Sequence, residues 1–276
     1  MLTAGRYRIL WFLLLTYALS SIFYVRIAST GKLHVLPVFG LMWCPGIAAL
    51  ILRLAFQHDL RGTGWGWHGV RWQVVAYLLP PALALAVYGG VWLTGIGSLT
   101  SAVLAAEARR SMLSLPAMLI VLVTLGLVQG AIFTLGEELG WRGFLVPELA
   151  RISSFTRTAL ISGAAWSVYH YPLIVFADYN SGTPAWFALP VFTWMVVASS
   201  FVYAWLRLKS GSLWTTVILH ASHNLFFQEV FDPLTKDRGT TKYFTTEFGL
   251  GLAVAYTVAA FYFWKRRAEV ERIDRG

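Results

Sequence analysis

The chain has 276 residues, of which 57% are hydrophobic and only 13% are charged, and its mean hydropathy is +0.62. Soluble domains carry about 25% charged residues, so this composition excludes an ordinary water-soluble fold. The formal net charge of +9 does not indicate a nucleic-acid partner, because the Lys and Arg residues stand at the ends of apolar runs, as in membrane proteins.

Eight apolar runs follow one another along the chain. They cover residues 9–25, 35–52, 73–95, 115–138, 157–177, 185–206, 212–230 and 246–264. A helix of about 20 apolar residues crosses the hydrocarbon core of a bilayer. The sequence therefore predicts an all-α polytopic membrane protein with about eight transmembrane helices in one bundle. No repeat, low-complexity segment or linker is apparent, so we expect a single membrane-embedded domain over residues 1–276.

Three further features of the sequence bear on this prediction. Residues 1–25 begin like a signal peptide, but their apolar stretch is longer than the usual core of about 7–15 residues, so an uncleaved first helix is expected. The segment 101–112 is expected to form a short amphipathic helix on the surface. Cys44 is the only cysteine, which excludes an intrachain disulfide and a cysteine-based metal site.

The basic residues predict the orientation in the membrane. If the eight runs cross in turn, 15 of the 22 Lys and Arg residues fall on the side of the two termini and seven on the other side. Cytoplasmic loops carry the excess of Lys and Arg. Both termini are therefore predicted to be cytoplasmic, in the cell membrane if the organism is prokaryotic.

Ionisable side chains are rare in the apolar segments. Each costs roughly 2.5–3.5 kcal/mol at the centre of a membrane helix, and such residues usually face a cavity or a partner. They belong to the fourth, fifth and seventh segments. The residues are Glu137, Glu138, Arg142, His170, His220 and His223, with Asn224 as a polar neighbour.

The stretch GEELGWRG contains two adjacent carboxylates. A helix places Glu138 and Arg142 one turn apart on the same face, in the favourable order for an ion pair. Glu137 is rotated by about 100° from that face. Because adjacent acids in a low dielectric resist ionising together, Glu138 and Arg142 are interpreted as structural and Glu137 as free for proton transfer. A snorkelling pair at a helix end is the alternative.

Two further stretches carry histidines. In WSVYHYP, His170 lies one turn after Trp166, and in ILHASHNLF, His220 and Asn224 share a helical face. A histidine and a carboxamide side by side can donate hydrogen bonds to a developing oxyanion. Packing of His170 in an aromatic helix, and hydrogen bonding of the other pair between helices, are the structural alternatives.

Together these groups can supply a general base, a partner that positions a water and donors for an oxyanion, which are the parts of a hydrolase. No G-x-S-x-G or H-E-x-x-H motif is present. A water-activating mechanism without a cofactor is expected, and Zn²⁺ held by Glu137, His170 and His220 is the alternative. A non-catalytic membrane protein, either an immunity scaffold or a transporter-like bundle, is the alternative from another class.

The three stretches resemble the motifs of a family of membrane proteases. EELGWRG resembles the EExxxR signature of the type II CAAX prenyl protease and bacteriocin-processing family, also called the CPBP or abortive-infection family. WSVYH is similar to its second motif, although Trp166 stands where phenylalanine is usual, and HASHN is similar to its third. The motifs occur in the family's order within a core of about residues 115–230.

This resemblance implies an intramembrane endopeptidase of the glutamic type, although members have also been described as metalloproteases. It implies a peptide, or a lipidated peptide or protein, as substrate, cut near the cytoplasmic leaflet among membrane lipids. Whether that substrate is prenylated is left open, because many prokaryotic members carry the motifs where no CAAX proteins are expected. The implied roles are water activation for Glu137 and His170, oxyanion stabilisation for His220 and Asn224, and support for Glu138 and Arg142, while His223 belongs to no motif.

Overall fold

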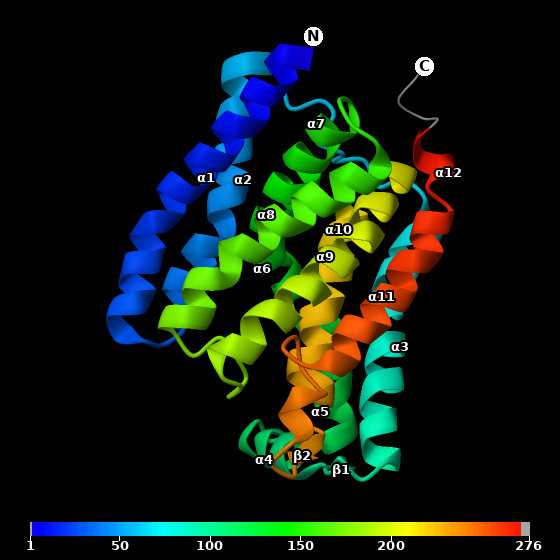
Figure 1. Ribbon diagram of the computed structural model, residues 1–276. Helices are drawn as coiled ribbons and strands as arrows, with labels where there is room; N and C mark the ends of the chain where they lie inside the picture. The colour runs from blue at the N-terminus through cyan, green and yellow to red at the C-terminus, as the bar shows by residue number, and fades with distance from the viewer. Residues whose placement is uncertain (1, 272–276) are drawn as a thin grey trace.

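The computed structural model describes residues 2–271, and most of them lie in helices (Figure 1). Segments η1 to η3 are π-helical and η4 is a 3₁₀ turn. The expected all-α membrane fold is confirmed. The elements in chain order are α1 (Leu2–Thr30), α2 (Val35–Gln57), α3 (Val70–Leu93), β1 (Gly97–Leu99), α4 (Ala102–Arg110), α5 (Leu115–Val121), η1 (Leu122–Gly126), α6 (Leu127–Gly140), η2 (Trp141–Leu145), α7 (Val146–Ala150), α8 (Phe155–Phe176), α9 (Ala185–Ser210), α10 (Leu213–Asn224), η3 (Leu225–Phe231), β2 (Thr235–Asp237), η4 (Thr241–Tyr243), α11 (Leu250–Lys265) and α12 (Ala268–Glu271).

Within the described residues, six helices are long and apolar enough to cross a membrane, so the predicted number of eight is not confirmed. They are α1, α2, α3, α8, α9 and the continuous helix that runs from α5 to α7. The other two expected spans correspond to shorter elements. One is α11, with 16 residues, and the other is α10, whose 12 residues continue into η3.

The helix that contains both glutamates is longer than predicted. The sequence places its end at residue 138, but it continues through η2 to Ala150 and has 36 residues in all. The residues from Trp141 to Val146 are all buried, so packing against protein keeps this part helical where the apolar run has ended. Glu137 and Glu138 therefore lie inside a helix, within one turn of the π-helical segment η2, and such segments are frequent at functional sites.

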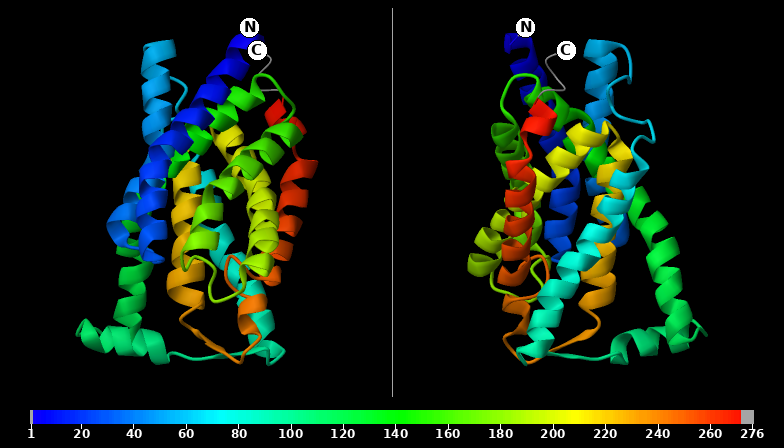
Figure 2. Two further views of the ribbon diagram at one scale, coloured as in Figure 1. Left: turned by 60° about the vertical axis from the view of Figure 1, so that its left-hand side comes forward. Right: turned by 90° about the vertical axis from the view of Figure 1, so that its right-hand side faces the viewer.

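The two ends of the bundle differ (Figures 1 and 2). The start of α1 and the short α12 lie at one end, while α4 and the strand pair β1–β2 lie at the other. The strands pair antiparallel, with Ser98 opposite Lys236. Helix α4, which matches the expected amphipathic helix, runs across this end, and α5 rises from it apart from the other helices.

Helices α2 and α6 approach each other backbone to backbone at glycines. A Cβ on Gly136 would lie 2.6 Å from Cα of Trp43, and one on Gly140 would lie 2.7 Å from the carbonyl carbon of Pro45. The spacing of these two glycines is the small-xxx-small pattern that lets membrane helices pack closely. The contact fixes the backbone on both sides of the two glutamates.

Hydrogen bonds from tyrosine hydroxyls hold α8 against α1 and α2. Tyr24 on α1 donates to the carbonyl oxygen of Tyr169 at 2.6 Å. The hydroxyl of Tyr169 donates to the carbonyl oxygen of Leu41 on α2 at 2.7 Å. These bonds fix the position of α8 at Tyr169. They therefore also fix the backbone of His170, which is the next residue.

Candidate active site

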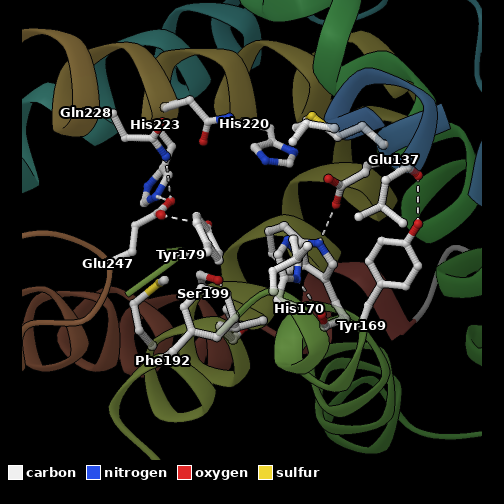
Figure 3. Close-up of a pocket in the computed structure, with 18 of the residues that line it drawn as sticks. Glu137, Tyr169, His170, Tyr179, Phe192, Ser199, His220, His223, Gln228 and Glu247 are labelled. Carbon is white, nitrogen blue, oxygen red and sulfur yellow. Dashed lines mark hydrogen bonds and ion pairs between the residues drawn. The ribbon is translucent and has the colours of Figure 1, made fainter. Parts of the chain in front are cut away.

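The four residues predicted to be catalytic, Glu137, His170, His220 and Asn224, line one cavity of about 190 Å³ (Figure 3), while the predicted supporting residues Glu138 and Arg142 are not part of its lining. Helices α2, α6, α8, α9 and α10 and the loop before α11 contribute to its wall. Much of that wall is apolar. The polar residues among those that line it include Glu137, His170, His220, Asn224, His223 and Glu247.

Glu137 is held in this wall by two tryptophans. Its side chain is buried, and Oε2 accepts hydrogen bonds from Nε1 of Trp166 at 2.6 Å and from Nε1 of Trp141 at 3.3 Å. Both bonds use the same carboxylate oxygen. Oε1 is therefore the oxygen that Glu137 can offer to a molecule in the cavity that it lines.

The ion pair that the spacing predicts between Glu138 and Arg142 is present. Nη1 of Arg142 donates to Oε1 of Glu138 at 2.8 Å, and neither side chain is more than 1% exposed. The guanidinium lies against the rings of both Trp166 and Tyr203, at 4.0 and 4.1 Å from their centroids. The alternative of a snorkelling pair at a helix end is therefore wrong, because burial and aromatic rings replace water around both charges.

His170 has a hydrogen bond that fixes its tautomer. Its Nδ1 lies 2.9 Å from the carbonyl oxygen of Trp166, one turn earlier. A carbonyl oxygen only accepts, so Nδ1 carries the proton and Nε2 of the neutral ring keeps its lone pair. The ring also contacts Phe192 and Tyr179, at centroid distances of 5.2 and 5.9 Å.

His220 is joined to the first motif by a contact that the sequence does not predict. Its Nδ1 donates to Oε1 of Glu138 at 2.9 Å, so that Glu138 binds His220 and Arg142 through one oxygen. Asn224, the last residue of α10, lines the same cavity as His220. The two residues of the third motif thus share a face, as their spacing predicts.

The sequence assigns no role to three residues that line this cavity, which are Glu247, Tyr179 and His223. Glu247 is one, and the sequence offers a signal for it, because it is the only charged residue between Lys242 and Lys265. Tyr179 donates from its hydroxyl to Oε2 of Glu247 at 2.7 Å. His223, to which the sequence gives no role, lines the cavity and lies 3.0 Å from Oε1 of Glu247.

The helices of this chain are apolar and long enough to cross a membrane, and they enclose a buried cavity that contains carboxylates and histidines. The chain is therefore an integral membrane protein with a polar site among its helices. Residues 114–226 match the family model described as type II CAAX prenyl endopeptidase Rce1-like. This segment contains all three motifs.

A stretch of 96 residues is 29% identical to the protein named CAAX prenyl protease 2 of Methanococcus maripaludis. It covers 32% of this chain and 34% of the relative, so the chain spans about a third of the length of the curated relative that it matches. The resemblance inferred from the three motifs is thereby confirmed over the segment that carries them.

Proposed function

We propose that the chain is an intramembrane peptidase of the CAAX protease type that uses a glutamate-activated water. The observation that supports this most directly is the carboxylate of Glu137. Its Oε2 is held by two indole N–H groups, while its Oε1 is left for the cavity that His170, His220 and Asn224 also line. A general base must reach the proton that it removes, and these groups are gathered around one space.

In the proposed mechanism Oε1 of Glu137 takes a proton from a water molecule. The lone pair on Nε2 of His170 accepts the second hydrogen bond of that water and orients it. The water oxygen then attacks the carbonyl carbon of the scissile peptide bond, and the carbonyl oxygen acquires negative charge. Both partners of the water come from helices whose positions are fixed by backbone contacts and tyrosine hydrogen bonds.

His220 and Asn224 serve as donors to this oxyanion. Nδ1 of His220 is used on Glu138, so Nε2 is the atom that can donate toward the cavity when the ring is protonated on both nitrogens. The carboxamide of Asn224 adds a second donor. When the intermediate collapses, the C–N bond breaks and the proton held by Glu137 passes to the leaving amine.

The proposed substrate is a lipidated peptide or protein, cut within the membrane. The curated relative is named a prenyl protease, and a prenylated peptide is therefore the first substrate to examine. The proposed orientation has both termini in the cytoplasm, because most Lys and Arg residues fall on that side.

The test is hydrolysis of fluorogenic prenylated and non-lipidated peptides by the purified protein and by Glu137→Gln. We expect turnover by the wild type and a loss of at least about 10³-fold in the variant, whose amide cannot accept the proton. Glu229→Gln is the matched control, because Glu229 is exposed and does not line the cavity. Undiminished turnover by Glu137→Gln would exclude the assignment, and binding without turnover by the wild type would favour a non-catalytic binding protein.

Metal dependence is tested separately. No three His, Cys, Asp or Glu side chains of residues 2–271 are gathered in an arrangement that could hold a metal ion. Under the proposed mechanism, activity persists after exhaustive chelation. Loss of activity on chelation, restored by Zn²⁺, would favour the alternative in which Glu137, His170 and His220 hold the metal.

A further inference from the structure

Glu247 is a carboxylate in the cavity that the mechanism proposed above does not use. It belongs to the loop between η4 and α11, is 7% exposed, and lies on the opposite side of the cavity from Glu137 (Figure 3). None of the three motifs includes it. Because a buried carboxylate is stable only when it is hydrogen-bonded, the partners of Glu247 indicate its role.

Three segments of the chain meet at this carboxylate. Its Oε1 accepts hydrogen bonds from Nε2 of His223 at 3.0 Å and from Nε2 of Gln228 at 3.1 Å. Its Oε2 accepts a hydrogen bond from the hydroxyl of Tyr179 at 2.7 Å. His223 lies on α10, Gln228 lies in η3, and Tyr179 lies in the loop between α8 and α9. Glu247 therefore ties the end of α10 to the loop that follows α8.

Tyr179 connects Glu247 to His170. The ring of Tyr179 packs against the imidazole of His170, with centroids 5.9 Å apart and planes 31° apart. Phe192 packs on the same imidazole at 5.2 Å and contacts the ring of Tyr179 at 5.9 Å. The hydrogen bond to Trp166 fixes one edge of the imidazole, and these two rings fix its plane. Since Glu247 holds the hydroxyl of Tyr179, it also helps to set the direction of Nε2 of His170.

His223 connects Glu247 to Asn224. Both ring nitrogens of His223 are occupied, because Nε2 donates to Glu247 and Nδ1 lies 2.9 Å from the hydroxyl of Tyr256 on α11. The next residue is Asn224, the last of α10, after which the chain continues as the π-helical η3. A fixed His223 therefore fixes the backbone from which the carboxamide of Asn224 extends. His220 has its own support, from Glu138.

The backbone beside Glu247 is held in an unusual conformation. Thr246 has a φ of 64°, in the left-handed region that a β-branched residue rarely adopts. Its N–H donates to the hydroxyl of Tyr88 on α3 at 3.2 Å, and on the other side of Glu247 the ring of Phe248 stacks on Phe192 at 5.3 Å. Backbone strain persists only where the surroundings hold it, and it is concentrated at functional sites. The strained turn at Thr246 places the carboxylate in the cavity.

We propose that Glu247 is a positioning residue, which holds His170 through Tyr179 and Asn224 through His223 in the arrangement that the reaction needs. This inference rests on the proposed peptidase function. It requires no contact between Glu247 and the substrate, because the carboxylate acts through its hydrogen bonds to described residues. The proposed effect falls on the orientation of the water and on one of the two oxyanion donors.

The experiment compares kcat and KM of purified variants on the best fluorogenic peptide. Glu247→Ala removes all three hydrogen bonds, whereas Tyr179→Phe removes one and keeps the ring that packs on His170. We expect kcat to fall by about 30-fold or more in Glu247→Ala and by about tenfold in Tyr179→Phe, with KM changed by less than about threefold. Glu247→Gln, whose amide oxygen still accepts from Tyr179, should lose less than Glu247→Ala. Tyr262→Phe is the matched control, because the hydroxyl of Tyr262 is bonded to Arg266 outside the cavity, and it should leave kcat unchanged.

The double variant tests whether Glu247 acts through Tyr179. Residues that act in one chain of contacts give effects that do not add. Glu247→Ala combined with Tyr179→Phe should therefore be as slow as Glu247→Ala alone. A further tenfold loss in the double variant would overturn the route through Tyr179.

Hydrogen exchange separates positioning from mere stability and does not require turnover. Amides of the loop 177–184 should exchange faster in Glu247→Ala and Tyr179→Phe than in the wild type, while kcat of the folded, monodisperse protein falls. A lower unfolding midpoint or faster exchange with unchanged kcat would overturn the positioning role and leave the peptidase function intact. Absence of cleavage by the wild type would overturn the peptidase function, and faster exchange in the variants would then leave Glu247 as a structural tie of the loop only.

Discussion

The indole Nε1 of Trp166 donates a 2.6 Å hydrogen bond to Oε2 of Glu137, 29 positions earlier in the chain. The same indole ring lies against the guanidinium of Arg142. One residue of α8 thus contacts both the proposed base and the buried ion pair of the first motif. Phenylalanine, which is usual at this position in the family that the motifs resemble, can provide the ring contact but not the hydrogen bond.

The first prediction concerns this hydrogen bond. Trp166→Phe keeps an aromatic ring beside Arg142 but leaves only the weaker 3.3 Å bond from Trp141 to orient Glu137. A hydrogen bond to a charged group contributes about 1.5–3 kcal/mol. We expect kcat to fall by about tenfold or more with KM changed by less than about twofold, measured on the best fluorogenic peptide. Trp186→Phe, at an exposed tryptophan, should leave both constants unchanged. A purely structural role for Trp166 would lower stability and leave kcat of the folded fraction intact.

The second prediction concerns the buried ion pair. Glu138→Gln removes the carboxylate that binds both Arg142 and His220, and it leaves the guanidinium buried without its partner. Such a loss costs about 3–5 kcal/mol. We expect a large decrease in the thermal unfolding midpoint in detergent. The control is Glu107→Gln, which breaks the exposed pair with Arg110 and should cost less than about 1 kcal/mol. Similar midpoints for the two variants would contradict the structural role of Glu138.

The third prediction concerns the glycines of GEELG. A Cβ at Gly136 or Gly140 would meet backbone atoms of α2 at less than 3 Å, so α2 and α6 would have to separate. Overpacking of this kind costs about 1–3 kcal/mol. Gly136→Ala and Gly140→Ala should each lower stability and, by displacing Glu137, the rate.

Gly130 offers the matched control for these substitutions, on the same helix. Its Cβ would meet only Ala221, at 3.4 Å or more, which is near ordinary contact. Because alanine is favoured over glycine in a helix by about 1 kcal/mol, Gly130→Ala should be neutral or slightly stabilising. Unfolding midpoints of the three variants in one detergent decide the matter, and a destabilised Gly130→Ala with unaffected Gly136→Ala would refute the close contact.

The fourth prediction concerns pH and the short helix α12. Hydrogen bonds from Arg266 at 2.6 Å and from Lys209 lower the pKa of Glu269 to about 2 from its ordinary value of 4.5. A lowered pKa in the folded state means that the ionised carboxylate stabilises the fold above about pH 4.5, and that this contribution disappears as the pH falls toward 2. Lowering the pH from 5 to 3 should therefore reduce the unfolding midpoint more in the wild type than in Glu269→Gln. Equal decreases of the unfolding midpoint in the two proteins would show that the contacts of Glu269 with Arg266 and Lys209 contribute nothing to stability.

The helices and the Glu138–Arg142 pair could be predicted because they depend on near neighbours in the sequence. Apolar runs reflect the bilayer, and the ion pair follows from the spacing of one helical turn. Even so, the boundary at residue 138 is wrong, because burial against other helices sustains the helix to Ala150. A span count based on apolar length alone also includes α10, which has only 12 residues before its π-helical continuation.

Most of the contacts that shape the cavity could not be predicted, because they join distant helices. His220 and Glu138 are 82 positions apart, and no periodicity links them. The second carboxylate, Glu247, lies at the start of the last apolar run, where an isolated acid is easily taken for a helix end. Its partnership with His223 becomes visible only when α10 and the loop before α11 are placed side by side.

The long helix that carries Glu137 has two very different surroundings. In its most apolar 18-residue window only 6% of the residues are buried, whereas the residues around the two glutamates are enclosed by protein. At 1.5 Å per residue a helix of this length extends about 54 Å, well beyond the roughly 30 Å of a bilayer core. A change in membrane thickness therefore acts on the lipid-facing part, as tilt or as bending at its π-helical turns. The proposed base, Glu137, lies on the same continuous helix. Tilting or bending of the lipid-facing part is therefore transmitted to the position of its carboxylate.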